Sequence, residues 1–288
     1  ISTRTPLANN GWDMMDELAA EENCVYKADT IEELAREAAA AGLDAIAVTD
    51  HDTLEGAGQI PEGLPVRVLP GIEISCFDYA ANLRVHVLGY GVQDRAAVER
   101  FVHPLLLARH ENSLRQIETL RRNGFSIDEG ALHRANGRYI YKQHIMEYLV
   151  KTGQAPDMFG GFYRSVFKNG GICDFDIQYL NPYEAVRVLR AAGGLAVLAH
   201  PGQQQNFALI PALVRAGLCG LERNHPANSA RDRALIDRIA GEQGLFLTGG
   251  SDFHGLYEKN PLGVGACLSE QSGAERVTGA TGAGRESA

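Results

Sequence analysis

The sequence lacks four features that would place it in a specialised class of protein. No apolar run approaches the roughly 18 residues of a membrane-spanning helix. Lys and Arg number 27 against 36 Asp and Glu, and the net charge of −9 argues against an extended surface for nucleic acid. The five cysteines are odd in number and show no paired zinc-type spacing, which predicts a reducing, cytoplasmic compartment. Residues 1–12 have no apolar core, so they do not resemble a signal peptide.

Helical and strand-like segments alternate along most of the chain. Apolar strand-like segments are expected at 43–48, 66–69, 72–75, 84–88, 195–198 and 245–248, and amphipathic helices at 182–192, 208–216 and 230–243. Thr30 and Glu33 form a capping-box pattern at the start of another helix that ends near Gly42. Alternation of helices and strands with short links predicts a parallel sheet, and polar residues at repeated strand ends predict a barrel mouth.

Residues 94–180 interrupt this alternation. A long helical stretch covers 94–122 and is expected to break near Pro104, and helical pieces follow around 127–135, 142–152 and 160–168. We therefore expect 1–93 and 181–270 to form a discontinuous barrel, with 94–180 as a helical insertion or cap. The segment 271–288 is rich in Gly, Ala, Ser and Thr and is expected to be a disordered tail.

Side chains of the kinds that bind metals follow or end several of the strand-like segments. Alone, each has a structural alternative, because histidine has many roles other than metal binding and an aspartate can cap a turn. Together they indicate a metal site at one end of a barrel, with imidazole and carboxylate groups that suit Zn, Mn or Fe. The candidates are His51, Glu73, His86, His200, Asp252 and His254.

A carboxylate can bridge two metals, so Glu73 is the natural bridging ligand in such a site. Two or three metals a few ångströms apart can activate a water and stabilise a leaving oxygen in phosphoryl transfer. The pattern is therefore compatible with metal-assisted phosphoryl transfer.

The order of the motifs resembles the PHP family, named for polymerase and histidinol phosphatase domains. These motifs are TDHD at 49–52, G-x-E at 71–73, H-x-L-G-Y at 86–90, AHPG at 199–202 and GGSDFHG at 249–255. The resemblance covers about residues 15–268 and is greatest to small bacterial metal-dependent phosphoesterases that act on nucleotide phosphates. It implies an α/β fold, a distorted (β/α)7 TIM-like barrel with a helical insertion, and up to three divalent metals.

The resemblance also implies roles for the candidate residues. Glu73, His86 and His200 match one complete metal position, and His51 and His254 match ligands of a second. Asp252, with the bridging Glu73, matches part of a third. The expected catalytic residues are His51, Glu73, Asp252 and His254.

Four further residues are candidates for binding the substrate phosphate. Arg138 and the stretch that contains Lys142 and His144 resemble the basic segment with which the family's insertion grips phosphate. A solvated helix face is the alternative for these three. His225 is a candidate for the same pocket, and a surface loop is its alternative.

The family's first strand is the part of the pattern that this sequence lacks. The family has D-L-H-x-H there, followed by S-D-G, whereas the matching positions here carry Ala19, Glu21, Tyr26 and Lys27. Tyrosine is a poor ligand near neutral pH because its reference pKa is about 10. We therefore expect fewer than three bound metals and reduced turnover. The missing ligands are neighbours in the sequence, and replacement of the whole segment, for example by a frameshift, is our hypothesis for their joint loss.

Three functions remain open from the sequence. The first is a metal-dependent phosphoesterase acting on a small phosphate ester, a nucleotide or the end of a short oligonucleotide. The second is a degenerate PHP protein that binds nucleotide or phosphate without catalysis. The third is an amidohydrolase-like metal hydrolase, although the single bridging glutamate and the GGSDFH segment favour the PHP resemblance.

Overall fold

A computed structural model describes residues 30–56, 60–132, 139–254 and 263–282. Within these ranges every helix is too short or too polar to span a lipid bilayer. The chain divides into two compact units. The first holds the described residues up to Val102 and from Tyr179 onward, and the second holds His103–Gln178.

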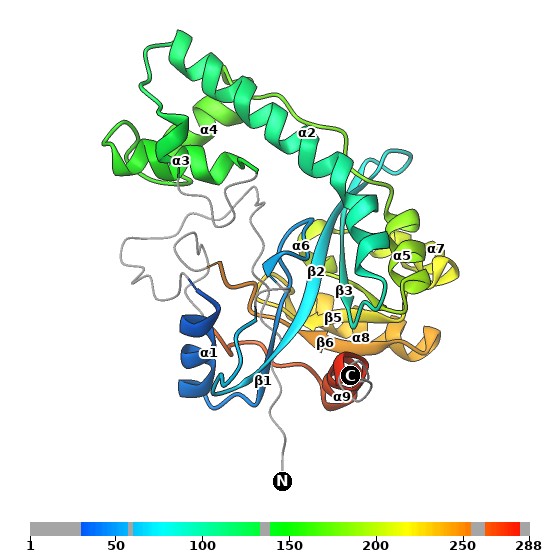
Figure 1. The fold of residues 1–288 in the computed structure, drawn as a ribbon. Helices are drawn as coiled ribbons and strands as arrows, with labels where there is room; N and C mark the ends of the chain where they lie inside the picture. The colour runs from blue at the N-terminus through cyan, green and yellow to red at the C-terminus, as the bar shows by residue number, and fades with distance from the viewer. Residues whose placement is uncertain (1–29, 57–59, 133–138, 255–262, 283–288) are drawn as a thin grey trace. The chain divides into compact units, whose positions relative to one another are not determined.

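A curled, six-stranded half-barrel sheet forms the first unit (Figure 1). Its strands lie in chain order and are β1 (Ala45–Val48), β2 (Arg67–Asp78), β3 (Leu83–Tyr90), β4 (Leu195–Leu198), β5 (Gly220–Asn224) and β6 (Phe246–Gly249). β1 is parallel to β2, and β4, β5 and β6 are parallel to one another, but β3 is antiparallel to both of its neighbours. The prediction of a wholly parallel sheet is therefore wrong at β3. Only 79–82 join β2 to β3, and a parallel crossover needs a dozen or more residues.

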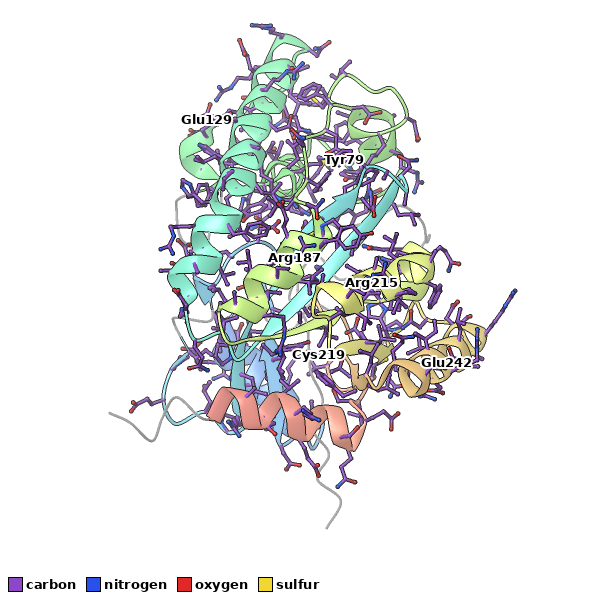
Figure 2. All side chains as sticks on the ribbon, turned by 90° about the vertical axis from the view of Figure 1, so that its right-hand side faces the viewer. Tyr79, Glu129, Arg187, Arg215, Cys219 and Glu242 are labelled. Atoms are coloured by element: carbon purple, nitrogen blue, oxygen red, sulfur yellow. The ribbon has the colours of Figure 1, made fainter. Side chains whose placement is uncertain are left out.

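β2 is one long strand where the sequence predicted two short ones. Pro70 and Gly71 lie inside it. The ladder to β1 ends at the pair Val48–Pro70, so the absent N–H of Pro70 falls at the end of that ladder. Beyond this point β2 continues as the antiparallel partner of β3, from Gly71 to Asp78. The tip of this hairpin carries Tyr79, which is exposed (Figure 2).

Helices cover one face of the sheet. α1 (Ile31–Ala40) packs Leu34 and Ala38 against alternate residues of β1, including Ile46. α5 (Pro182–Ala191) approaches β3 closely at Gly89, where a Cβ atom would lie 2.4 Å from Leu189 Cδ2. The remaining helices of this unit before β6 are α6 (Pro201–Gln204), the short 3₁₀ turn Phe207–Leu209, α7 (Ile210–Ala216) and α8 (Ala230–Gln243).

These helices turn charged side chains to solvent. Arg187 on α5, Arg215 on α7 and Glu242 on α8 are all exposed (Figure 2). Leu189 and Leu213, by contrast, are fully buried, which gives the helices their two-sided character.

The opposite face, here called the inner face, holds a separate apolar cluster. Side chains alternate across a strand, so residues two apart share a face. The cluster consists of Ala45, Ala47, Leu69, Leu88, Tyr90, Val197, Ala199 and Val277. Glu73 is four residues beyond Leu69 on β2 and His86 is two before Leu88 on β3, so both belong to this inner face.

The C-terminal segment differs from its prediction. Residues Gln271–Gly282 form helix α9, whereas the composition predicted a disordered tail from 271. Val277 is fully buried in the inner-face cluster, and Ala274 is buried one turn before it. At Gly273 a Cβ atom would lie 1.9 Å from Leu247 O, so only glycine permits this approach to β6. Tertiary packing therefore stabilises this helix, although the glycine-rich segment has a low intrinsic helix propensity.

The second unit is helical and has its own core. It holds most of α2 (Arg95–Arg122), the 3₁₀ turn Glu129–Ala131, α3 (Lys142–Lys151) and α4 (Gly161–Phe167). Its core includes Ile117, Leu120, Ile145, Met146, Leu149 and Phe167. α2 is continuous through Pro104, so the predicted interruption there is wrong. Loss of one backbone donor inside a helix of 28 residues leaves the turns on both sides intact.

Candidate metal centre

Ligand-type side chains from β2, β3 and the end of β4 meet on the inner face. His86 Nδ1 lies 2.7 Å from Glu73 Oε1 and 3.3 Å from His200 Nε2. His200 Nε2 lies 3.1 Å from the same Glu73 oxygen. Ligands of one tetrahedral zinc ion lie about 3.3 Å apart when each bond is about 2.0–2.1 Å. The three side chains therefore have nearly the spacing that a single bound ion requires.

His51 joins this group from the loop after β1. One ligand atom each of His51, Glu73 and His86 lie within 4.8 Å of one another, and all three side chains are buried. The backbone ladder fixes this loop, because Glu73 N donates to Asp50 O at 3.1 Å and Asp52 N donates to Glu73 O at 2.9 Å. Ser75 Oγ lies 3.1 Å from His51 Nδ1. Nε2 is therefore the ring nitrogen that His51 can offer to a metal.

His86 lies within the segment 84–88 that its alternation predicts as a strand. In the structure it lies inside β3 and pairs with Ser75 of β2. Because β3 is antiparallel, its beginning lies at the edge of the sheet where its parallel neighbours end. A residue near the start of β3 therefore reaches the same place as residues after β1 and β4.

A second group lies beside the first. His225 Nε2 is 3.5 Å from Asp252 Oδ2, and His254 Nδ1 is 3.8 Å from Asp252 Oδ1 and 2.6 Å from Asp252 O. The rings of His200 and His225 have their centroids 5.0 Å apart, which connects the two groups. The structure thus brings together His51, Glu73, His86 and His200, and places Asp252, His225 and His254 next to them.

Burial and charge act against each other at the carboxylates. Burial opposes ionisation of Glu73, but the charge of His51 and hydrogen bonds from His200 and His86 outweigh it and hold the Glu73 pKa well below its usual value. Burial also opposes ionisation of Asp252, and the charges of His254 and His225 again outweigh it, so that its pKa is low. Both side chains are therefore anionic ligands at neutral pH.

The pKa values of the two histidines that contact Glu73, His86 and His200, are shifted in opposite directions. Burial favours the neutral ring of His86 more strongly than Glu73 favours the charged ring, and the pKa of His86 falls. Burial acts in the same sense on His200, but the hydrogen bond and charge of Glu73, with the charges of Asp252 and Glu222, outweigh it and raise its pKa to about 9. Metal-free, the pair Glu73–His200 is an ion pair, and a cation would replace the proton of His200.

The donor set fits a divalent cation. Glu73 Oε2 and His200 Nδ1 are buried, and neither has a hydrogen-bond partner among the described residues. A buried polar atom without a partner costs about 1–3 kcal/mol, so such atoms are uncommon outside functional sites. A bound cation accounts for the carboxylate oxygen. His51, Glu73, His86 and His200 are the residues that would hold the ion, by nitrogen and oxygen donors that suit Zn, Mn or Fe.

Backbone outliers lie in three of the segments that build the site. Asp52, His200 and Asp252 have φ values of 59°, 24° and 51°, although none of them is a glycine. Non-glycine residues held at positive φ cost of order 1–3 kcal/mol each and collect at functional sites. The three outliers follow β1, β4 and β6, which is where the family resemblance places the ligands.

Three predicted phosphate-binding residues lie in the second unit or outside the described ranges. Lys142 and His144 lie on α3 in the second unit, where Tyr141 N donates to His144 Nδ1 at 3.0 Å and Lys142 Nζ lies 5.9 Å from the Phe167 ring centroid. Arg138 lies outside the described residues, as do the altered positions Ala19, Glu21 and Tyr26.

Neither Glu222 nor Asn228 is among the candidate site residues named from the sequence. Glu222 Oε2 accepts a hydrogen bond from His200 N at 2.8 Å, and Asn228 Oδ1 accepts one from Gly202 N at 2.9 Å. Both side chains are almost fully buried. The available signal was a carboxylate directly after the apolar segment 218–221, since a buried carboxylate needs a partner.

Comparison with known proteins decides the family. No protein-family model matches this chain. Over 254 residues the chain is 41% identical to a phosphoribosyl 1,2-cyclic phosphate 1,2-diphosphodiesterase of Eggerthella lenta, which covers 86% of this chain and 97% of that protein. This chain belongs to the PHP family of metal-dependent phosphoesterases.

Two further PHP similarities agree with this assignment. A 3′,5′-nucleoside bisphosphate phosphatase of Chromobacterium violaceum is 29% identical over 240 residues, which are 75% of this chain and 79% of that protein. A crystal structure from Bifidobacterium adolescentis, provisionally described as a metal-dependent phosphoesterase, matches with a TM-score of 0.79 over 96% of each chain. At 22% identity, that likeness shows a common fold.

Proposed function

We propose that this PHP protein hydrolyses a small phosphate ester of ribose at a divalent-metal centre held by His51, Glu73, His86 and His200. The observation that carries the proposal is the meeting of two imidazole nitrogens on Glu73 Oε1, at 2.7 and 3.1 Å, beside a buried Glu73 Oε2 that lacks a donor among the described residues. The two relatives are named for a phosphoribosyl cyclic phosphate and for a nucleoside bisphosphate. Both names describe a ribose that carries more than one phosphate group.

The chemistry follows from the donor set. A divalent metal supplies Lewis-acid activation of a phosphate ester. His51, Glu73 and His200 fix its place, and buried, preorganised groups of this kind lose little energy to reorganisation during the reaction. Asp252 and His254, from the loop after β6, are proposed to complete the catalytic group. Mn, Zn and Fe all suit these donors.

His225 is proposed to contact the substrate phosphate. Ala227 N donates to His225 Nδ1 at 3.1 Å, so Nε2 is the ring nitrogen of His225 that can donate a hydrogen bond. This N–H faces Asp252 Oδ2 at 3.5 Å, which is too long for a strong hydrogen bond. A phosphate oxygen placed between the rings of His225 and His200 would receive a better one. Arg138, Lys142 and His144 of the insertion 94–180 remain proposed as further phosphate ligands.

Three further expectations, about the barrel, the insertion and the cellular compartment, accompany this proposal. We propose that the described half-barrel is part of a closed, distorted (β/α)7 barrel, since the first strand of the family pattern would fall in the undescribed residues before Thr30. The insertion 94–180 is proposed to select the substrate. The four described cysteines are unpaired, which supports a reducing, cytoplasmic compartment.

The test is hydrolysis by the purified, Mn²⁺-loaded protein. Phosphate release from adenosine 3′,5′-bisphosphate and ring opening of phosphoribosyl 1,2-cyclic phosphate, followed by ³¹P NMR, separate the monoester and cyclic diester activities. His200→Ala should abolish the activity, and His103→Ala, which changes an exposed histidine of α2, should leave it unchanged. Activity in the wild type no greater than in His200→Ala would reject the proposal. Hydrolysis of amides without hydrolysis of phosphate esters would favour an amidohydrolase.

A second candidate is a PHP protein that binds a phosphate ester without hydrolysing it. The sequence at Ala19, Glu21 and Tyr26 favours this reading, because the family's His-x-His pair is absent there. Elemental analysis after saturation with Mn²⁺ distinguishes the two. Three ions per chain would contradict the non-catalytic reading, and one or none would support it.

A further inference from the structure

His200 reaches the metal centre only because its backbone leaves the strand geometry. Val197 and Ala199 belong to the inner-face cluster, so strict alternation after β4 would turn the next side chain to the outer face. Instead, His200 has φ 24° and ψ 59°, and its Nε2 lies 3.1 Å from Glu73 Oε1 on the inner face. The positive φ is thus what aims this ligand.

Local backbone preferences oppose this conformation. Positive φ is unfavourable for a residue with a Cβ atom, and the residue before a proline, as His200 is before Pro201, prefers extended backbone. Within the turn, Gln203 N donates to His200 O at 3.0 Å. Such a conformation persists where surrounding contacts over-determine it, and further contacts come from other parts of the chain.

Two buried side chains that follow in the chain supply them. Glu222 Oε2, on β5, accepts a hydrogen bond from His200 N at 2.8 Å. Asn228 Oδ1 accepts one from Gly202 N at 2.9 Å, while its Nδ2 donates to Glu222 O and Arg223 O, each at 3.0 Å. A Cβ atom at Gly202 would lie 2.5 Å from Asn228 Oδ1, so the two segments are in direct contact. The Asn228 side chain therefore connects the backbone of β5 with the backbone after β4.

We infer that Glu222 and Asn228 are positioning residues, which hold the turn at His200–Gly202 so that His200 presents Nε2 to the metal. The inference rests on the proposed role of His200 as a metal ligand. Glu222 acts here through an accepted backbone hydrogen bond. A neutral amide oxygen can accept the same bond, so the role needs an acceptor at this position and not a negative charge.

Titration of chelator-treated protein with Mn²⁺, with free Mn²⁺ followed by electron paramagnetic resonance, tests this. Glu222→Leu removes the acceptor and should raise the Kd for Mn²⁺ roughly 10–100-fold, as loss of groups that orient metal ligands commonly does. Glu222→Gln keeps the acceptor and should stay within about threefold of the wild type. Thr248→Val is the matched control, since Thr248 is the register partner of Glu222 on β6 and its Oγ has no hydrogen-bond partner among the described residues.

The outcomes are distinguishable. A folded Glu222→Leu protein that binds Mn²⁺ as tightly as the wild type overturns the inference, and so does a Glu222→Gln protein as weak as Glu222→Leu, because the charge would then be what matters. If Glu222→Leu does not fold, Asn228→Ala decides by the same readout, and an unchanged Kd overturns the inference. A wild type that binds no Mn²⁺ refutes the metal centre and this inference together, whereas equal Kd values in wild type and Glu222→Leu refute this inference alone.

Discussion

Binding of Mn²⁺ at pH 8 is expected to release about one proton per ion, and His200 is the source. Its pKa of about 9 means that roughly nine in ten molecules carry the imidazolium at this pH when no metal is bound. A metal binds only the neutral ring, so that proton must leave. Glu73 contributes none, because its lowered pKa keeps it ionised, and His86 contributes none, because its lowered pKa keeps it neutral.

The choice of pH 8 removes a competing source of protons. Burial, opposed by the charge of His254, raises the pKa of Asp50 to about 7, so Asp50 also carries a proton in neutral solution. At pH 8 about nine in ten Asp50 side chains are ionised, and the release reports mainly on His200. At pH 9 only half of the His200 rings are charged, so the release should fall to about one half per ion.

Isothermal titration calorimetry measures this release. The observed binding enthalpy is plotted against the ionisation enthalpy of several buffers, and the slope gives the number of protons exchanged. His103→Ala should give the same slope as the wild type, since this exposed residue lies in α2. A release near zero at pH 8, or one that rises between pH 8 and pH 9, would refute the assignment of a charged His200 to the metal-free site.

Three other predictions test separate parts of the molecule. Tyr183→Phe should cost about 2 kcal/mol of unfolding free energy at pH 7, because Tyr183 donates a 2.6 Å hydrogen bond to the Asp78 carboxylate. That bond lowers the Asp78 pKa, so the stabilisation is present above the unfolded pKa of 3.8 and is lost as pH falls through the folded pKa. Urea denaturation of the wild type and the variant at pH 7 and at pH 3 measures the cost at each pH. An equal cost at the two pH values contradicts this account. Val277→Ala should cost about 2 kcal/mol by the same measurement, because two methyl groups leave a fully buried position, whereas a disordered tail would give no change. Restoring the family pattern with Ala19→His and Glu21→His should raise the number of Mn²⁺ ions bound per chain, and an unchanged metal content would show that the two positions are wrongly matched.

Local pattern in the sequence was enough to predict most of the elements. The strand-like segments 195–198 and 245–248 match β4 and β6 within a residue, and 142–152 matches α3. Each has a clear periodicity or apolar run bounded by Gly or Pro. The direction of β3 was not predictable in this way, because the alternation of side chains is the same in parallel and antiparallel strands. The short link 79–82 was the missed clue.

The candidate metal ligands could also be predicted from the sequence, but the contacts that orient their side chains could not. Glu73 and His86 follow from strand alternation on paired strands, and motif order brought in His51 and His200. The role of Glu222 depends on a contact with a backbone group 22 residues away, and no local pattern encodes such a contact. Helix α9 was missed for a similar reason, because burial of Val277 against the sheet outweighs a composition rich in glycine.

The proposed metal ligands are positioned in two ways, by regular β-sheet pairing and by a strained turn. Glu73 and His86 sit on regular strands, so the ladder that builds the sheet also fixes their relative position. The residues on either side of His51, Asp50 and Asp52, each form a backbone hydrogen bond with Glu73. Of the four proposed ligands of this ion, His200 is the one held at positive φ, and the acceptor of its backbone hydrogen bond, Glu222, lies on the next strand of the same sheet. This arrangement makes one metal position depend on β2, β3 and the loops after β1 and β4, all within 50–200. The proposed single-ion site therefore needs no ligand from residues 19–26, and we expect the altered first segment to change how many ions bind more than whether one ion binds.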